Sequence, residues 1–147
     1  QAISEVEERA NSTLASMDDY DSMDIKLSID RPGEVSISVR MGAETSYRDF
    51  ETFSGGERFL VSFAIRMALA QILSNKYGAD IRFILMDEAD SALDEFNIGR
   101  FADITKRLSA DRLIMMISHK NILKDIIPQN IHIVRSGSTS SISTGVN

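Results

Sequence analysis

Two short apolar runs, each followed at once by polar residues, constrain the fold of this 147-residue chain more than any other feature. The first extends from Ile81 to Met86 and ends at Asp87-Glu88, and the second extends from Leu113 to Ile117 and ends at Ser118-His119. Between them, residues 95–108 repeat apolar side chains at helical spacing. This strand–helix–strand order predicts buried parallel strands joined by a crossover helix, and hence an α/β fold.

The flanking segments complete the predicted architecture. Residues 2–16 place apolar side chains on one helical face, which fits either the end of a coiled coil or a lone amphipathic helix. Residues 25–29 and 35–41 alternate apolar and polar side chains around Arg31-Pro32-Gly33, and so predict a β-hairpin. The other expected elements are a long helix from about Phe59 to Ile72, a short helix over 121–126, a strand over 131–134, and a Ser-rich end, 136–147, that either adds an edge strand or frays.

Composition narrows the class of protein. The chain is 43% hydrophobic and 26% charged, as expected of a globular domain, and it has no cysteine for disulfides or thiolate metal sites. No apolar run approaches the roughly 20 residues of a membrane span, and the charged start does not resemble a secretion signal. The net charge of −6 disfavours a surface devoted to phosphate backbones, so DNA would have to meet a local patch or another chain.

A serine-glycine-glycine turn precedes the long apolar helix. Glycines let a backbone approach a ligand closely, and the helix behind them directs free N–H groups and its positive dipole end to the same place. Ser54, Gly55, Gly56 and Glu57 therefore form a candidate site for an anion such as a terminal phosphate. Taken alone, Ser-Gly-Gly is more often a helix-capping serine followed by a flexible turn.

The polar residues that end the two apolar runs are candidates for chemistry. Acids directly after a buried strand are costly unless they face a cation or water. The pair suits Mg²⁺, with Asp87 holding the metal through a water and Glu88 polarising an attacking water. His119 could hydrogen-bond a phosphate or that water. Taken singly, each acid also fits a solvated loop, and His119 fits a structural role.

Taken in order, with Ser91-Ala92-Leu93-Asp94 between the last two clusters, these motifs resemble the C-terminal lobe of ABC-type ATPase heads. The resemblance is to SMC and Rad-fifty proteins, and it covers Phe53 to about Val134. It implies a mainly parallel sheet flanked by helices and preceded by a β-hairpin and a coiled-coil stub. Residues 1–16 would end the coiled coil, and 17–147 would form the lobe.

The same resemblance implies a role for each motif, with ATP and Mg²⁺ as cofactors. Ser54 to Glu57 would be the signature motif, which contacts the γ-phosphate of a nucleotide held by the opposite head. Asp87 would be the Walker B aspartate, Glu88 the catalytic glutamate and His119 the switch histidine. Ser91, Ala92, Leu93 and Asp94 would form the D-loop at the interface between heads.

The phosphate-binding pattern G-x-x-x-x-G-K-[ST] does not occur in this sequence. The resemblance therefore implies that an N-terminal lobe supplies it, and that the chain alone hydrolyses ATP negligibly. Other implied partners are a second head in an ATP-dependent homodimer, DNA, and a Mre-eleven-type nuclease, or a kleisin if the head is of SMC type. The implied location is the cytoplasm and nucleoid, or the nucleus.

The residues that distinguish the Rad-fifty and SMC subfamilies do not agree in this sequence. Arg58 and residues 59–70 are more similar to Rad-fifty, which favours a head acting in DNA double-strand-break repair. Asp90, Asn97 and Lys120 are more similar to SMC, a chromosome-organising head. A nucleotide-gated DNA clamp with incidental hydrolysis is a further alternative. A membrane-transporter ATPase is disfavoured by the helical segment that precedes the hairpin.

Overall fold

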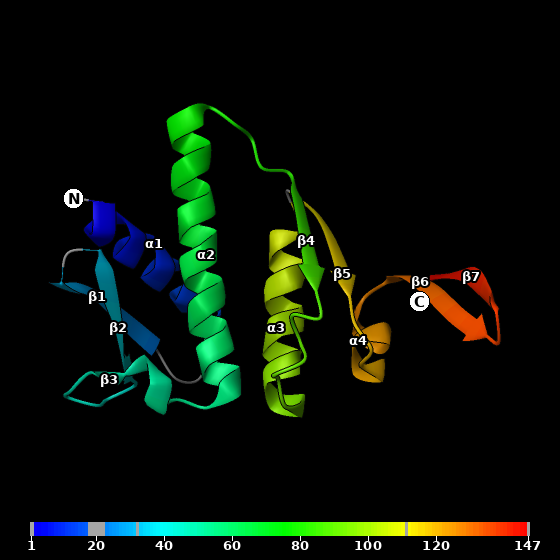
Figure 1. The fold of residues 1–147 in the computed structure, drawn as a ribbon, viewed down its shortest axis with the longest axis horizontal. Helices are drawn as coiled ribbons and strands as arrows, with labels where there is room; N and C mark the ends of the chain where they lie inside the picture. Colours follow the sequence, from blue (N-terminus) through cyan, green and yellow to red (C-terminus); the bar gives the residue numbers. More distant parts are fainter. Residues whose placement is uncertain (1, 18–22, 32, 111, 147) are drawn as a thin grey trace.

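The computed structural model describes residues 2–17, 23–31, 33–110 and 112–146 (Figure 1). Pro32 of the predicted turn and most of the predicted polar link after the first helix lie outside these ranges. In chain order the elements are α1 (Ala2–Met17), β1 (Met23–Arg31), β2 (Glu34–Met41), β3 (Arg48–Asp49), the 3₁₀ turn η1 (Phe50–Thr52), α2 (Gly55–Tyr77), β4 (Phe83–Asp87), α3 (Glu95–Leu108), β5 (Leu113–Ile117), α4 (Asn121–Ile126), β6 (Gln129–Ser136) and β7 (Thr139–Val146).

The described strands form three small sheets. β1, β2 and β3 are antiparallel, β4 and β5 are parallel, and β6 and β7 are antiparallel. The prediction of a mainly parallel sheet therefore holds only for β4 and β5 and is wrong for the described chain as a whole. The reason is connection length, because tight turns can join only antiparallel neighbours, whereas the crossover helix α3 allows parallel pairing.

Several elements extend further than their sequence patterns. α2 begins directly after Ser54 and ends where Gly78 takes a left-handed conformation with φ of 63°. The Ser-rich end does not fray, because β7 pairs with β6 from Ser136↔Thr139 to Gln129↔Val146. Among the described residues, no helix has both the length and the apolar composition that crossing a membrane requires.

The first hydrophobic core lies between α1, the β1–β2 hairpin and α2, on the left of Figure 1. Helix α1 also protects the outer edge of β1. The side chain of Asn11 accepts from the backbone N–H of Ile25 at 2.7 Å and donates to its carbonyl at 2.9 Å, and Glu7 accepts from the N–H of Leu27 at 2.7 Å. The expected helix is therefore present and packed in this chain, whereas its continuation as a coiled coil stays a prediction.

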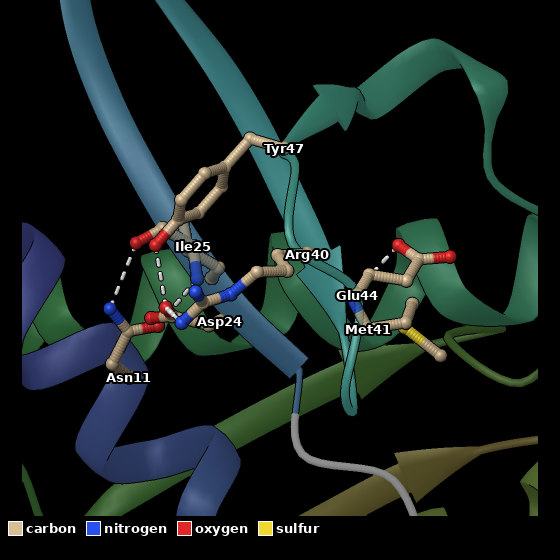
Figure 2. Close-up of polar contacts among 7 residues, drawn as sticks. All are labelled: Asn11, Asp24, Ile25, Arg40, Met41, Glu44 and Tyr47. Atoms are coloured by element: carbon tan, nitrogen blue, oxygen red, sulfur yellow. Dashed lines mark hydrogen bonds and ion pairs between the residues drawn. The ribbon is translucent and has the colours of Figure 1, made fainter.

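A polar cluster joins β1, β2 and the loop before β3 (Figure 2). Asp24 accepts from the hydroxyl of Tyr47 and from the guanidinium of Arg40, both at 2.6 Å. The guanidinium also lies 5.0 Å from the centre of the tyrosine ring. The hydrogen bond to Asp24 raises the pKa of Tyr47 above its ordinary value, because it stabilises the neutral phenol.

The second core is centred on Phe101 of α3, which is fully buried. Phe59 and Phe63 of α2 meet its ring edge-on at 5.1 and 5.9 Å between centroids, so this cluster also joins α2 to α3. β4 and β5 contribute only every second side chain to it. The prediction that these strands are buried is therefore correct for one face and wrong for the other.

Candidate active site

Asp87 and Glu88 lie at the edge where the two parallel strands end. Asp87 pairs in register with Ile117, the last residue of β5. The backbone N–H of Glu88 donates to the carbonyl of Ile117 at 2.9 Å, which extends the ladder one residue beyond β4. Both acids are exposed. Their carboxylates are therefore open to a ligand at the sheet edge where α/β proteins bind one.

Glu88 has an unusual backbone conformation. Its φ is 46°, and it is the one non-glycine residue with positive φ in the described ranges. Such a conformation costs a residue with a side chain about 1–3 kcal/mol and is concentrated at functional sites. Two backbone hydrogen bonds hold it, the one to Ile117 and a turn in which the N–H of Ser91 donates to the Glu88 carbonyl at 3.0 Å.

His119 meets Glu88 at this edge. Its Nε2 lies 2.9 Å from Oε1 of the glutamate, although the two residues are 31 positions apart. The side chains remain 84% and 57% exposed. The pair predicted from the ends of two separate strands is thus brought together by their parallel pairing. Because both groups are open to solvent, a water molecule can reach the carboxylate and the imidazole at the same time.

The serine-glycine-glycine turn caps α2. Ser54 Oγ accepts from the backbone N–H of Glu57 at 3.4 Å, and the Glu57 carboxylate accepts from the N–H of Ser54 at 2.8 Å. These two bonds form a capping box, so the structural role of Ser54 is present. Glu57 places a negative charge at the helix start, where an anion would also sit, so an incoming phosphate would have to bind beside it.

The turn packs against the segment that precedes α3. A Cβ on Gly56 would lie 2.5 Å from Nδ2 of the buried Asn97, and one on Gly55 would lie 3.5 Å from the carbonyl oxygen of Ala92. Gly56 is therefore required by close packing between the two helices. The structure places the predicted signature turn beside the predicted D-loop.

That segment, Ser91 to Asp94, is anchored at its end and exposed at its start. Leu93 is buried, and Asp94 caps α3 by accepting from the N–H and Nδ2 of Asn97 at 2.8 and 3.0 Å. Ser91 and Ala92 are exposed next to Gly55. The anchored residues fix a short surface loop whose free portion can contact a second molecule.

A buried polar network behind the Glu88–His119 pair escaped the sequence interpretation. Asp90 is only 2% exposed and accepts from the hydroxyl of Ser118 at 2.6 Å. Ser118 Oγ in turn accepts from the N–H of Lys120 at 2.9 Å, and Lys120 Nζ donates to the carbonyl of Leu93. In the sequence, Asp90 and Lys120 are only points of similarity to SMC proteins. The available signal was that residues 90 and 118 both follow closely on the ends of neighbouring strands.

A groove of about 1130 Å³ lies between α2 and β4. Its lining includes Gly55 from the signature turn, the acids Asp87 and Glu88, and Ser91 and Ala92. Ser54 and His119 are outside that lining. The groove therefore unites the start of α2 with the acidic edge of β4, and places His119 at its border through the contact with Glu88.

The donor set at Asp87 fits magnesium bound together with a phosphate ligand. Among the residues that the structure describes, no three His, Cys, Asp or Glu side chains gather as a metal cage. Mg²⁺ does not need one, because it commonly binds one or two carboxylates, several waters and phosphate oxygens. One exposed carboxylate at Asp87 beside an open groove meets that requirement.

Comparison with known families and sequences agrees on one group of proteins. Residues 29–107 match the family described as "SbcC/RAD50-like, Walker B motif". The chain is 31% identical to the SbcC component of the nuclease SbcCD from Lactococcus lactis over 91 residues, which is 61% of the chain and 9% of that protein. It is 27% identical to the DNA double-strand break repair Rad50 ATPase of Methanocaldococcus jannaschii over 104 residues, 71% of the chain and 10% of that protein.

SMC proteins are similar as well. Identity to the chromosome partition protein Smc of Coxiella burnetii is 29% over 91 residues, 62% of the chain and 6% of that protein. A structure from work on ATP-driven dimerization of SMC ATPases superposes with a TM-score of 0.77 at 21% identity, covering 97% of this chain and 84% of that one. These structural likenesses establish the fold. The chain spans about a tenth of the length of the curated relatives it matches.

Proposed function

The chain belongs to the SbcC/RAD50-like family of ABC-type ATPases, and on that premise we propose that it is the C-terminal half of an ATP-hydrolysing head acting in DNA double-strand-break repair. The head would dimerise around ATP. One observation carries the proposal: the strained Glu88 meets His119 at 2.9 Å, directly beside Asp87, at the open edge of a parallel strand pair.

Each of the three side chains has a distinct task in the proposed reaction. Asp87 would hold Mg²⁺, whose charge neutralises the phosphate oxygens. Glu88 would orient a water molecule and accept its proton as the water oxygen attacks the γ-phosphorus and the bond to ADP breaks. His119 would donate its Nε2–H to the Glu88 carboxylate, 2.9 Å away, and so keep that carboxylate in place; it would hydrogen-bond the γ-phosphate only by giving up this bond, because the N–H carries one proton. The products are ADP and phosphate.

The exposed apolar face of β4 and β5 supports the proposal that a second lobe packs against these strands. Phe83, Leu85, Leu113, Met115 and Ile117 are between 46% and 67% exposed, and together they form an apolar surface on one side of the strand pair. Contiguous apolar surfaces of this kind commonly mark interfaces. We assign this face to the N-terminal lobe, which would also supply the phosphate-binding loop that this sequence lacks.

The signature turn supports action across two heads. Ser54 and Gly55 are exposed at the start of α2, and Ser91 and Ala92 lie beside them on the surface. Two exposed turns that lie side by side suit contact with a nucleotide presented by another head. In the proposed cycle ATP stabilises the engaged dimer because it binds that state preferentially, and hydrolysis releases it.

An SMC-type head is the second candidate, and specific residues favour it. Asp90, Asn97 and Lys120, the SMC-like marks, are the side chains that tie the D-loop segment to its neighbours. A nucleotide-gated clamp is a variant of either head, but a clamp without hydrolysis has no need of the strained Glu88. DNA and a nuclease would be partners of a repair head, whereas a kleisin would bind an SMC head, as ScpA binds the Smc head in one similar solved structure.

The test is to assemble the chain with an N-terminal lobe that carries the phosphate-binding loop and to measure Mg²⁺-dependent ATP hydrolysis. The assembled head should hydrolyse ATP, and the chain alone should not. Glu88→Gln should lower the rate about 10²–10⁴-fold, because it removes the proton acceptor, while ATP-dependent dimers persist in size-exclusion chromatography. Ser54→Arg should prevent those dimers by adding bulk and charge at the interface.

Two matched controls sharpen this experiment. Glu95→Gln changes another exposed glutamate, in the first turn of α3, and Ser109→Arg changes another exposed serine, at the end of the same helix. Both should leave hydrolysis and dimerisation unchanged. Normal turnover by the chain alone, or normal dimerisation of Ser54→Arg, would count against the assignment of half-sites. Stimulation by linear DNA but not by closed circular DNA would favour the repair head, because DNA also activates the SMC ATPases of one similar solved structure.

A further inference from the structure

The residues on both sides of His119 are tied to the loop that follows β4. Ser118, before it, donates its hydroxyl to the buried carboxylate of Asp90 at 2.6 Å. Lys120, after it, donates its ammonium group to the carbonyl of Leu93. The imidazole itself is 84% exposed. With so little packing around the ring, its position depends largely on where the backbone of residues 118–120 is held.

Ser118 is the central residue of this arrangement. Its hydroxyl has one proton, which the carboxylate of Asp90 accepts. The oxygen therefore remains an acceptor for the backbone N–H of Lys120, at 2.9 Å. This bond from residue 118 to residue 120 closes a serine turn around His119. One side chain thus sets the backbone on either side of the histidine.

The same contacts lead to the D-loop segment. Asp90 and Leu93 form a turn in which the N–H of Leu93 donates to the carbonyl of Asp90 at 3.0 Å. Both contacts from the 118–120 turn reach this one turn of four residues. A displacement of Ser91 or Ala92, the exposed part of the segment, would therefore be passed to the backbone that carries His119.

We propose that Ser118, held by the buried Asp90, is a positioning residue that sets the imidazole of His119 against Glu88 and links it to the D-loop. The inference rests on the proposed function, because His119 and Glu88 have a catalytic task only in that reaction. In the proposed reaction Ser118 and Asp90 contact neither ATP nor Mg²⁺, so their effect on hydrolysis would pass through His119.

The experiment is a double-mutant cycle in the head assembled with its N-terminal lobe, followed by single-turnover ATP hydrolysis. Ser118→Ala should lower the rate roughly tenfold, a common cost of losing an outer hydrogen-bond partner, with the KM for ATP unchanged. Ser118→Thr, which keeps the hydroxyl, should restore most of the rate. In a His119→Ala background, Ser118→Ala should cause no further loss, because residues that act as a unit are not additive.

Two further variants serve as a control and as a substitute for Ser118→Ala. Ser109→Ala removes an exposed serine hydroxyl far from the pair and should leave the rate unchanged. Asp90→Asn keeps the volume of the buried side chain. If Ser118→Ala unfolds the head, Asp90→Asn replaces it in the double-mutant cycle with His119→Ala. An active head in which the tenfold loss persists without His119 overturns this inference alone. An assembled head without Mg²⁺-dependent hydrolysis overturns the proposed function, and this inference with it.

Discussion

The two halves of the molecule differ in how completely they bury their own apolar surface. The region of α1, β1–β3 and α2 encloses a core in which Ala10, Ile25, Val39 and Leu60 are at most 1% exposed. The region of β4–β7, α3 and α4 buries Phe101 equally well but leaves one face of β4 and β5 open. Both regions contain regular strands and helices, so the difference lies in what covers each sheet.

The difference shows which region of the chain buries its apolar side chains without another molecule. In the first region, α1 supplies apolar packing and also satisfies the edge of β1 through Asn11 and Glu7. In the second, α3 covers one face of the parallel pair only. The β6–β7 hairpin adds to the contrast, because its apolar side chains are exposed; they are Ile131, Ile133, Val134 and Ile142. Under the proposed function, the N-terminal lobe would bury in the second region what the first region buries internally.

Truncating one leucine in each region should give the largest difference between the two regions in the free energy of unfolding. Leu60→Ala, in the first core, should lower the free energy of unfolding by about 2–5 kcal/mol, because it removes a fully buried side chain and leaves a cavity. Leu113→Ala, at 67% exposure on the open face, should change it by no more than about 0.5 kcal/mol. Urea denaturation of the chain measures both.

The same leucine pair also tests the open face as an interface. Titration of each variant with the N-terminal lobe, followed by calorimetry, should show weakened binding for Leu113→Ala. A large loss of chain stability in Leu113→Ala would show that the face is already covered within the chain, and the contrast between the regions would then fail.

A pair of glycines tests the contact that joins the regions. Gly56→Ala should destabilise the chain by about 1–3 kcal/mol, because its Cβ would meet the buried Asn97 at 2.5 Å. Gly99→Ala, within α3, has no atom within 4 Å of the new Cβ and should stabilise by about 0.5–1 kcal/mol. Thermal unfolding compares them. Recovery of stability in Gly56→Ala/Asn97→Ala would identify the clash as the cause, and equal stability of the two single variants would contradict close packing here.

The smallest expected effect on stability comes from Tyr47, in the region of α1, β1–β3 and α2. The raised pKa of Tyr47 means that its hydrogen bond to Asp24 stabilises the fold fully below the ordinary tyrosine pKa of about 10. That contribution is lost as pH rises through the higher folded value. Tyr47→Phe should cost no more than about 1 kcal/mol at pH 7, since the group is exposed, and should remove this alkaline loss. Tyr77→Phe, at 71% exposure, is the control, and identical pH profiles for Tyr47→Phe and the unsubstituted chain would exclude the contribution.

Local patterns were sufficient to predict most elements. The alternation in residues 25–29 and 35–41 indicated the hairpin, helical spacing over 95–108 indicated α3, and Ser54 was a candidate cap at the start of α2. The Ser-rich end was ambiguous because its strand, β7, is defined by pairing with β6 and not by its own apolar content. The mainly parallel sheet was wrong because strand orientation depends on which strands become neighbours, and that is a long-range property.

The candidate site divides in the same way. Asp87, Glu88 and His119 were predictable because the end of an apolar run is visible in the sequence, and parallel pairing then brings the ends together. Asp90 was not, because burial of an acid in a polar loop depends on contacts with Ser118 that no local pattern records. The packing of Gly56 on Asn97 is equally a contact between two helices.

The sequence by itself determined the family, the order of the motifs and the polar residues at the strand ends, since these follow from residue type and spacing along one chain. Only the tertiary structure decided that Glu88 adopts a strained conformation beside His119, that Asp90 is buried behind them, and that one face of β4–β5 stays open. The physical reason is that burial and hydrogen-bond partners arise from segments far apart in the chain, and packing alone determines which of them meet.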